Sequence, residues 1–217
     1  MSAKDVIIER IRTALQDVEE SDPEVDVPID WEFGKALATD NIVDDFVEKV
    51  LDYRATVVRV APDRVLEAIV DALASLGSER IVLPDGLSPS WVDGVTGTGL
   101  FVTGDDPTLT HAELNDVDTV ITTCAVAMAD SGTIALTHGT GQGRRALTLL
   151  PDKHLCVVNA SQVVSDVPEG VALLTPAIRE RRPITWLSGG SATSDIELER
   201  VEGVHGPRTL YVVLVED

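Results

Sequence analysis

The sequence predicts an α/β protein: a three-layer α/β/α domain on a mostly parallel sheet, preceded by an N-terminal helical arm. Short, continuous apolar runs rich in Val, Ile and Thr recur along the chain, and segments with helical periodicity separate many of them. Continuous rather than alternating apolar strands indicate a sheet that is covered on both faces. The 217 residues, 44% of them hydrophobic, are enough for one large core without a metal or disulfide.

The elements are predicted in chain order from apolar periodicity and from capping residues. An amphipathic helix is expected over residues 3–20, followed by an acidic, proline-containing linker that ends near residue 30. This predicts an arm over residues 1–30 and an α/β domain over residues 31–217. Further helices are expected at residues 40–53, 62–76 and 111–115. Strands are expected at residues 55–60, 80–83, 100–103, 119–122, 133–137, 155–158, 184–187 and 210–215. Residues 119–122 and 133–137 lie too close together for a long helix between them, so an antiparallel or irregular element is expected there.

The charge excludes several classes of partner. With 17 basic and 37 acidic residues the chain carries a formal charge of −20, which argues against nucleic acids and anionic membranes. No apolar run reaches the roughly 18 residues that span a bilayer, and the N-terminus lacks a secretion signal, so we expect a cytoplasmic protein without membrane insertion. The acids concentrate in residues 1–130, which carry 27 acids and nine bases, whereas residues 131–217 carry ten and eight.

Familiar cofactor motifs fail at single positions. The dinucleotide fingerprint would need glycine at Arg144, and the Walker motif would need lysine at Leu100. The four histidines show no metal-ligand spacing, and the two cysteines are too few for an iron–sulfur cluster. We therefore expect neither a metal nor a cofactor in this chain.

The first candidate anion site is a pair of glycine-rich turns over residues 129–133 and 138–145. Glycines let a ligand approach the backbone closely, and arginines supply planar donors for a carboxylate or phosphate. The plainer interpretation is a glycine-rich hairpin with an exposed arginine pair. The candidate binding residues here are Gly132, Thr133, Gly141, Gly143, Arg144 and Arg145.

A second candidate precedes a helix that is expected to begin at Ser194. A strand, two glycines and three hydroxyls before a helix N-terminus would form an anion site. Ordinary helix capping explains the same residues, and the helix dipole alone explains Asp195. The candidate binding residues are Gly189, Ser191, Thr193 and Asp195.

A third candidate is the tight turn over residues 203–208. It holds His205 as a possible proton donor and Arg208 as an anion contact, although a histidine in a turn is more often structural.

Two stretches resemble a known family. The segments ITTCAVAMADSGTIALTHGTGQGRRALTLLPDKHLCVV (residues 121–158) and SGGSATSDIELERVEGVHGPRTLYVVLV (residues 188–215) are similar to the LUD domain of the lactate-utilization protein C family. The chain departs from the family pattern at Asp130-Ser131-Gly132, where Glu-Thr-Gly is usual, and at Gly189-Gly190-Ser191, where Gly-Pro-Ser is usual. The resemblance implies a fold like that of glucosamine-6-phosphate deaminase, ribose-5-phosphate isomerase and the CoA transferases. It also implies a cytoplasmic role in oxidising L-lactate to pyruvate beside A- and B-type partner proteins that carry iron–sulfur clusters.

Three functional hypotheses follow. The leading one is a lactate-utilization component that binds a small carboxylate at the glycine and arginine loops; whether this subunit is itself catalytic stays open. The second is a stand-alone enzyme on a sugar phosphate or CoA thioester, with Asp130 as base or nucleophile and His205 as acid. The third is a non-catalytic module that senses a ligand or serves as a scaffold.

Overall fold

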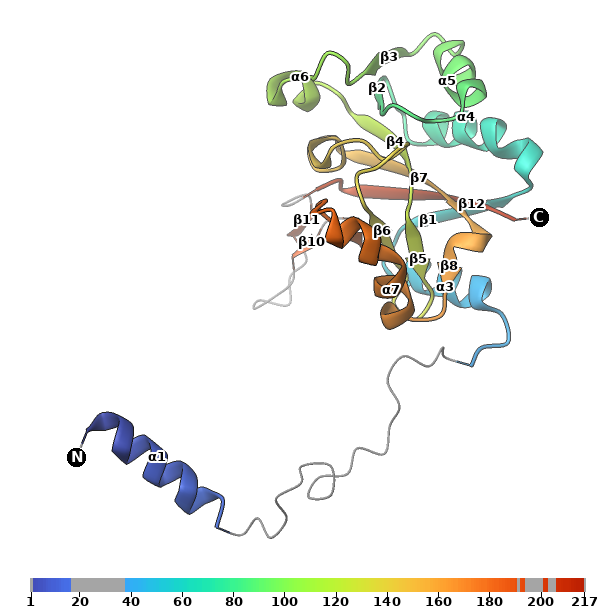
Figure 1. The fold of residues 1–217 in the computed structure, drawn as a ribbon. Helices are drawn as coiled ribbons and strands as arrows, with labels where there is room; N and C mark the ends of the chain where they lie inside the picture. Colours follow the sequence, from blue (N-terminus) through green and yellow to red (C-terminus); the bar gives the residue numbers. More distant parts are fainter. Residues whose placement is uncertain (1, 17–37, 191, 194–200, 203–205, 217) are drawn as a thin grey trace. The chain divides into compact units, whose positions relative to one another are not determined.

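The structure is a computed structural model that describes residues 2–16, 38–190, 192–193, 201–202 and 206–216 (Figure 1). The chain divides into two compact units, residues 1–35 and 36–217, and each is described by itself. The first unit contains α1 (Ala3–Ala14), which begins at a capping box formed by Ser2 and Asp5. Its apolar side chains are exposed: Val6, Ile7, Ile11 and, at the C-cap, Leu15.

The second unit is built on a six-stranded sheet in which every neighbouring pair is parallel (Figure 1). The strand order is β1-β12-β7-β4-β2-β3. The strands are β1 (Thr56–Val60), β2 (Arg80–Leu83), β3 (Phe101–Gly104), β4 (Thr119–Thr123), β7 (Lys153–Asn159) and β12 (Thr209–Val215). The central strands β4, β7 and β12 are almost entirely buried, which explains their continuous apolar sequences.

Helices cover one face of this sheet. The helices α4 (Val65–Ser75) and α5 (Pro89–Thr96) pack their apolar side chains against alternate residues of the strands. The 3-10 helix η1 (Pro62–Arg64) leads directly into α4. Ile69 and Leu73 from α4 share one buried cluster with Leu155 and Val213 from the sheet.

The opposite face is covered by α3 (Ile42–Asp52) and by a second, four-stranded sheet of order β8-β5-β6-β9. Its strands are β5 (Val126–Met128), β6 (Thr133–Leu136), β8 (Val163–Val164) and β9 (Thr185–Leu187). The hairpin β5–β6 is antiparallel, β9 pairs antiparallel with β6, and β8 pairs parallel with β5. The outer side of this sheet packs against α7 (Val167–Arg179) through Leu174.

The remaining elements are short. They are α6 (His111–Asn115), η2 (Arg145–Thr148), η3 (Ala160–Gln162), β10 (Ala192–Thr193) and β11 (Val201–Glu202), of which the last two pair with each other. The helix expected from Ser194 lies outside the described residues. Among the helices that the structure describes, none combines the length and the apolar character of a membrane span.

The predicted fold class is confirmed: the protein is α/β with a mostly parallel sheet. The element expected between residues 119–122 and 133–137 is the antiparallel hairpin β5–β6, in a sheet of its own. The runs at residues 133–137 and 184–187 belong to this second sheet, so a sheet occupies much of the layer where helices were expected.

The glycine-rich loop over residues 138–143 is tied to the carboxyl ends of two adjacent strands. Gly141 donates its N–H to the carbonyl of Asp85 after β2, at 2.8 Å, and accepts from the N–H of Thr123 in β4, also at 2.8 Å. The chain leaves β2 toward β3 and leaves β4 toward β7, so this is a topological switch point of the sheet. In open α/β sheets, ligands favour such positions.

Candidate functional site

The largest concentration of predicted site segments surrounds a cavity of about 460 Å³. This inter-sheet cleft lies beside η2, the beginnings of β7 and β12, and β9 of the second sheet. It is lined by residues 145, 148–149, 154, 184–190, 206–207 and 210. Pockets for small molecules typically range from about 300 to 1,000 Å³, so the cleft has the size of a ligand site.

The cleft is electrostatically distinct from the rest of the protein. The chain contains 37 acidic residues, yet Asp and Glu are missing from these described lining residues. Arg145 is exposed, and within the described part of the chain no carboxylate forms an ion pair with it. The part of the cleft wall that the structure describes has one unneutralised guanidinium and no carboxylate, which favours an anion.

His154 forms part of the cleft wall from inside the sheet. Its side chain is 1% exposed, and its Nε2 lies 2.7 Å from Thr122 Oγ1. Its Nδ1 is buried and lacks a hydrogen-bond partner among the described residues. Burial lowers the pKa of His154 to about 4, so the ring is neutral at physiological pH.

The β9 wall of the cleft is connected to the glycine-rich loop through His138. Thr185 Oγ1 lies 2.8 Å from His138 Nε2, and His138 Nδ1 lies 2.9 Å from the Gly143 carbonyl. Because a carbonyl only accepts, Nδ1 carries the proton, and Nε2 accepts from the Thr185 hydroxyl. Burial lowers the pKa of His138, the hydrogen bond to the Gly143 carbonyl opposes this, and Arg145 acts in the same direction as burial.

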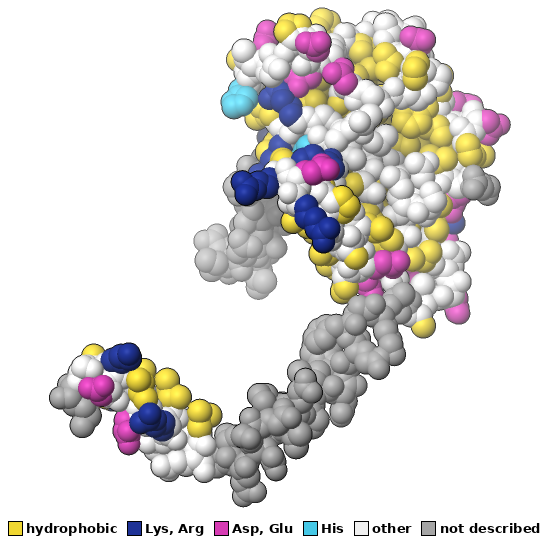
Figure 2. Space-filling view, viewed as in Figure 1, with side chains coloured by type: hydrophobic (Ala, Val, Ile, Leu, Met, Phe, Trp, Pro, Cys, Tyr) yellow, Lys and Arg dark blue, Asp and Glu magenta, His cyan; other side chains and the backbone are white. Residues whose placement is uncertain are grey.

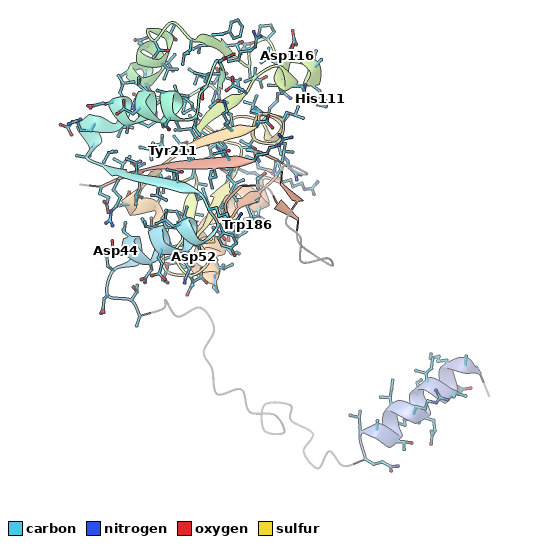
Figure 3. The ribbon with its side chains drawn as sticks, turned by 180° about the vertical axis from the view of Figure 1, so that it is seen from behind. Asp44, Asp52, His111, Asp116, Trp186 and Tyr211 are labelled. Atoms are coloured by element: carbon cyan, nitrogen blue, oxygen red, sulfur yellow. The ribbon has the colours of Figure 1, made fainter. Side chains whose placement is uncertain are left out.

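The outer part of the β9 wall is aromatic. Trp186 is 44% exposed and lies on the flank seen in Figure 3.

The predicted glycines of the second candidate are present in the cleft wall, and both have packing reasons to be glycine. Gly189 has a φ of +85°, and a Cβ there would lie 2.5 Å from the Tyr53 Cβ. A Cβ on Gly190 would lie 2.2 Å from the Arg208 carbonyl oxygen. Ser188, just before them, has its Oγ 2.7 Å from Thr133 Oγ1, which places the predicted Thr133 next to the cleft wall.

Gly143 and Arg144 line a different cavity, of about 450 Å³, at the switch point of the sheet. This crevice is lined by residues 84–86, 105, 138–140, 143–144 and 147. The Arg144 guanidinium is already paired within the protein. Its Nε and Nη2 donate to Asp105 at 2.6 and 3.0 Å, and Nη2 also donates to the Leu109 carbonyl at 2.6 Å. Asp105 raises the pKa of Arg144. With Asp85 and Asp105 in its wall, the crevice is less favourable to an anion than the inter-sheet cleft.

Asp130 and Gly132 lie in a third place, beside α3. Asp130 is exposed and lines a cavity of about 180 Å³ together with Asp45, Glu48 and Lys49. Gly132 has a φ of +59°, and a Cβ there would lie 2.8 Å from the Lys49 backbone. Neither residue lines the inter-sheet cleft or the crevice.

The third candidate is described only in part. Gly206 and Pro207 line the inter-sheet cleft, whereas Arg208 is exposed and its Nε lies 3.7 Å from Asp152. His205, Ser191 and Asp195 lie outside the described residues, as does the side chain of Thr193.

Sequence reasoning missed five polar or aromatic side chains of the cleft: Thr148, His154, Thr185, Trp186 and Ser188. The sequence does contain a signal for His154, because this histidine directly precedes the apolar run Leu155–Val158. Cys124 and Cys156 are buried free thiols. The described residues contain no cluster of three or more metal-ligating side chains.

The fold and the site define a class: an α/β domain whose parallel sheet packs against a smaller mixed sheet, with a cationic cleft between the two. The LUD domain family matches residues 38–215, so the chain belongs to this family. A protein from Deinococcus radiodurans called "Lactate utilization protein C" is 48% identical over 82% of each chain. A protein of the same name from Halalkalibacterium halodurans is 27% identical over 90% of this chain and 88% of its own. The crystal structure of a DUF162 family protein from Deinococcus radiodurans is similar with a TM-score of 0.69 at 43% identity, covering 81% of this chain and 96% of that one.

Proposed function

We propose that this chain is a component of lactate utilization that binds a small carboxylate in the inter-sheet cleft. The observation that carries the proposal is the charge of the cleft: Arg145 has no ion-pair partner among the described residues, and no described lining residue is acidic. The two relatives named for lactate utilization support the substrate class.

Arg145 supplies most of the affinity in this proposal. A guanidinium binds a carboxylate through charge-assisted hydrogen bonds, each contributing about 1.5–3 kcal/mol. The hydroxyls of Thr148 and Ser188 also line the cleft and offer neutral hydrogen bonds. Leu149, Ile184 and Leu210 give the cleft an apolar part that suits the methyl group of lactate.

The wider role that we propose is the cytoplasmic oxidation of L-lactate to pyruvate together with A- and B-type partner proteins. The oxidation removes two electrons and two protons from lactate, and the iron–sulfur clusters of the partners would accept the electrons. The buried positions of Cys124 and Cys156 support this division, because neither thiol is presented at the surface for cluster binding. This chain would hold the carboxylate near its partners.

The test combines binding and growth. Calorimetry on the purified chain with L-lactate and pyruvate should give a Kd that rises about 10- to 150-fold in Arg145→Gln. Arg179→Gln is the matched control, because Arg179 is exposed at the end of α7 and does not line the cleft. A deletion strain that also lacks other lactate dehydrogenases should grow on L-lactate only when the parent gene or the control variant is restored. Equal affinity of Arg145→Gln and the parent would place the site elsewhere, and unimpaired growth of the deletion strain would refute the lactate role.

A further inference from the structure

We propose that His154 Nδ1 is the atom that recognises the C2 oxygen of a 2-hydroxy or 2-oxo acid, while Arg145 binds the carboxylate. This inference rests on the proposed function and deepens it, because it separates lactate and pyruvate from carboxylates that lack a second oxygen. It makes His154 a specificity-determining residue of the inter-sheet cleft.

The first step of the argument is the unsatisfied nitrogen. A buried polar atom without a hydrogen bond is costly, and native proteins contain few of them. Two buried side-chain atoms lack a partner among the described residues, Ser131 Oγ and His154 Nδ1. Of these two residues, only His154 lines the inter-sheet cleft. In the proposal, a ligand bound in this cleft supplies the missing bond.

The second step is that the ring is held in place. Nε2 lies 2.7 Å from Thr122 Oγ1 on the neighbouring strand β4, and the Thr122 hydroxyl also lies within 3.8 Å of Cys156 Sγ. His154 is the register partner of Val120 in β4 and of Leu210 in β12, so parallel strands fix its backbone on both sides. A ring that is held by a strand and by a hydrogen bond loses little conformational freedom when a ligand binds.

The third step is the chemistry of a neutral imidazole. One ring nitrogen of a neutral histidine donates and the other accepts, and the Thr122 hydroxyl is compatible with either arrangement at Nε2. The hydroxyl of a 2-hydroxy acid both donates and accepts, so it pairs with Nδ1 in either tautomer. The carbonyl of a 2-oxo acid only accepts, so it requires the proton on Nδ1. Propionate has the carboxylate and the methyl group but no oxygen at C2, and it leaves Nδ1 unpaired.

The experiment compares L-lactate, pyruvate and propionate in calorimetric titrations of the intact chain. The expected result is that propionate binds at least about tenfold more weakly than L-lactate, because it leaves the buried nitrogen unpaired. Equal affinities for L-lactate and propionate would overturn the inference while leaving a carboxylate site in place. No binding of any of the three acids would overturn the proposed function, and the inference with it.

Variants and nuclear magnetic resonance make the test specific to this residue. His154→Phe should bind propionate as the parent does and lose the preference for L-lactate; a retained preference in the folded variant would refute the role of His154. His111→Phe is the control, since His111 is exposed on α6 and does not line the cleft. If His154→Phe does not fold, the parent protein labelled with ¹⁵N at histidine decides the question. The Nδ1 resonance of His154 should shift with L-lactate and stay in place with propionate, and an unchanged resonance with both would refute the inference.

Discussion

The adjacent residues Arg144 and Arg145 should respond to the same substitution in opposite ways. Arg144 points into an ion pair in the crevice, where its guanidinium makes two hydrogen bonds to Asp105 and one to the Leu109 carbonyl. Arg145 lines the inter-sheet cleft without an ion-pair partner among the described residues. Arg144→Ala should therefore reduce stability, whereas Arg145→Ala should reduce ligand affinity.

The structure sets the size of the Arg144 effect. The Asp105 side chain is 14% exposed and that of Arg144 is 32% exposed, so removing the arginine leaves a largely buried carboxylate without its counter-charge. Fully buried pairs lose about 3–5 kcal/mol on such a change and exposed pairs less than about 1 kcal/mol. Asp105 keeps one hydrogen bond from the Leu109 N–H at 3.0 Å, so we expect a loss of about 2–3 kcal/mol.

The assays are urea unfolding for stability and calorimetric titration with L-lactate for binding. A loss of about 2–3 kcal/mol corresponds to a decrease of about 5–10 °C in Tm for a domain of this size. Asp105→Asn is the partner variant, and the double variant should lose less stability than the sum of the two single changes. If Arg144→Ala keeps its stability and loses the ligand while Arg145→Ala keeps both, the site lies in the crevice and the assignment to the inter-sheet cleft is wrong.

Three further predictions test other parts of the fold. His154 has a pKa of about 4 in the folded protein against an ordinary value of 6.5, so the unfolded chain binds the proton first. The free energy of unfolding should therefore fall by up to about 3 kcal/mol as the pH decreases from 6.5 to 4. Urea unfolding should show a steeper dependence of stability on pH in the parent than in a folded His154→Phe variant, and equal dependences would contradict the prediction. Gly190→Ala should lower the Tm of the domain in thermal unfolding, because the new Cβ would lie 2.2 Å from a backbone oxygen. Gly104→Ala is the control and should leave the Tm unchanged, because the atom nearest to its Cβ would lie at 4.0 Å. Equal Tm values for the two variants would show that the backbone adjusts at Gly190. Cys124 and Cys156 should react with a thiol reagent only after unfolding, because both are buried. The neighbouring Cys156 thiol and burial also raise the pKa of Cys124, which disfavours the reactive thiolate. Rapid labelling of the native protein would contradict this prediction.

The parallel strands were predictable because their sequences carry one dominant signal. Each of the predicted runs at residues 80–83, 155–158 and 210–215 lies within or matches a strand, since burial on both faces selects continuous apolar residues. The short helix at residues 111–115 was predicted with the bounds that it has, and a capping box at Thr110 explains where it begins.

Two helices were missed because their sequences contain residues that usually interrupt helices. The helix α7 contains Gly170 and Pro176, and α5 contains Gly94. Gly170 is explained by packing, since a Cβ there would lie 2.7 Å from the Met128 side chain of the second sheet. The need for glycine at position 170 comes from a contact between residues about forty positions apart. Local sequence patterns carry no information about such a contact.

The glycine-rich turns show why the candidate site was only partly predictable. The sequence pattern predicts that the candidate glycines are points where a ligand approaches the backbone, yet all four have a packing partner within the protein: Lys49 for Gly132, Thr123 for Gly141, Leu147 for Gly143 and Tyr53 for Gly189. Gly189 and Gly143 still line cavities, so close packing and site formation are compatible at the same residue. The residue type alone does not distinguish the two.

The distribution of charge connects the sequence to the site. Residues 131–217 are nearly neutral, and they contribute every lining residue of the inter-sheet cleft that the structure describes. In Figure 2, basic side chains gather around the C-terminal end of α7, where Arg179 and Arg181 are exposed. A ligand carboxylate near Arg145 would thus meet no acidic side chain among the described lining residues, and exposed charges beyond about 8–10 Å are largely screened at physiological salt. Ligand binding should then depend only weakly on ionic strength compared with its dependence on Arg145, because one nearby guanidinium, and not the field of the whole protein, provides the attraction.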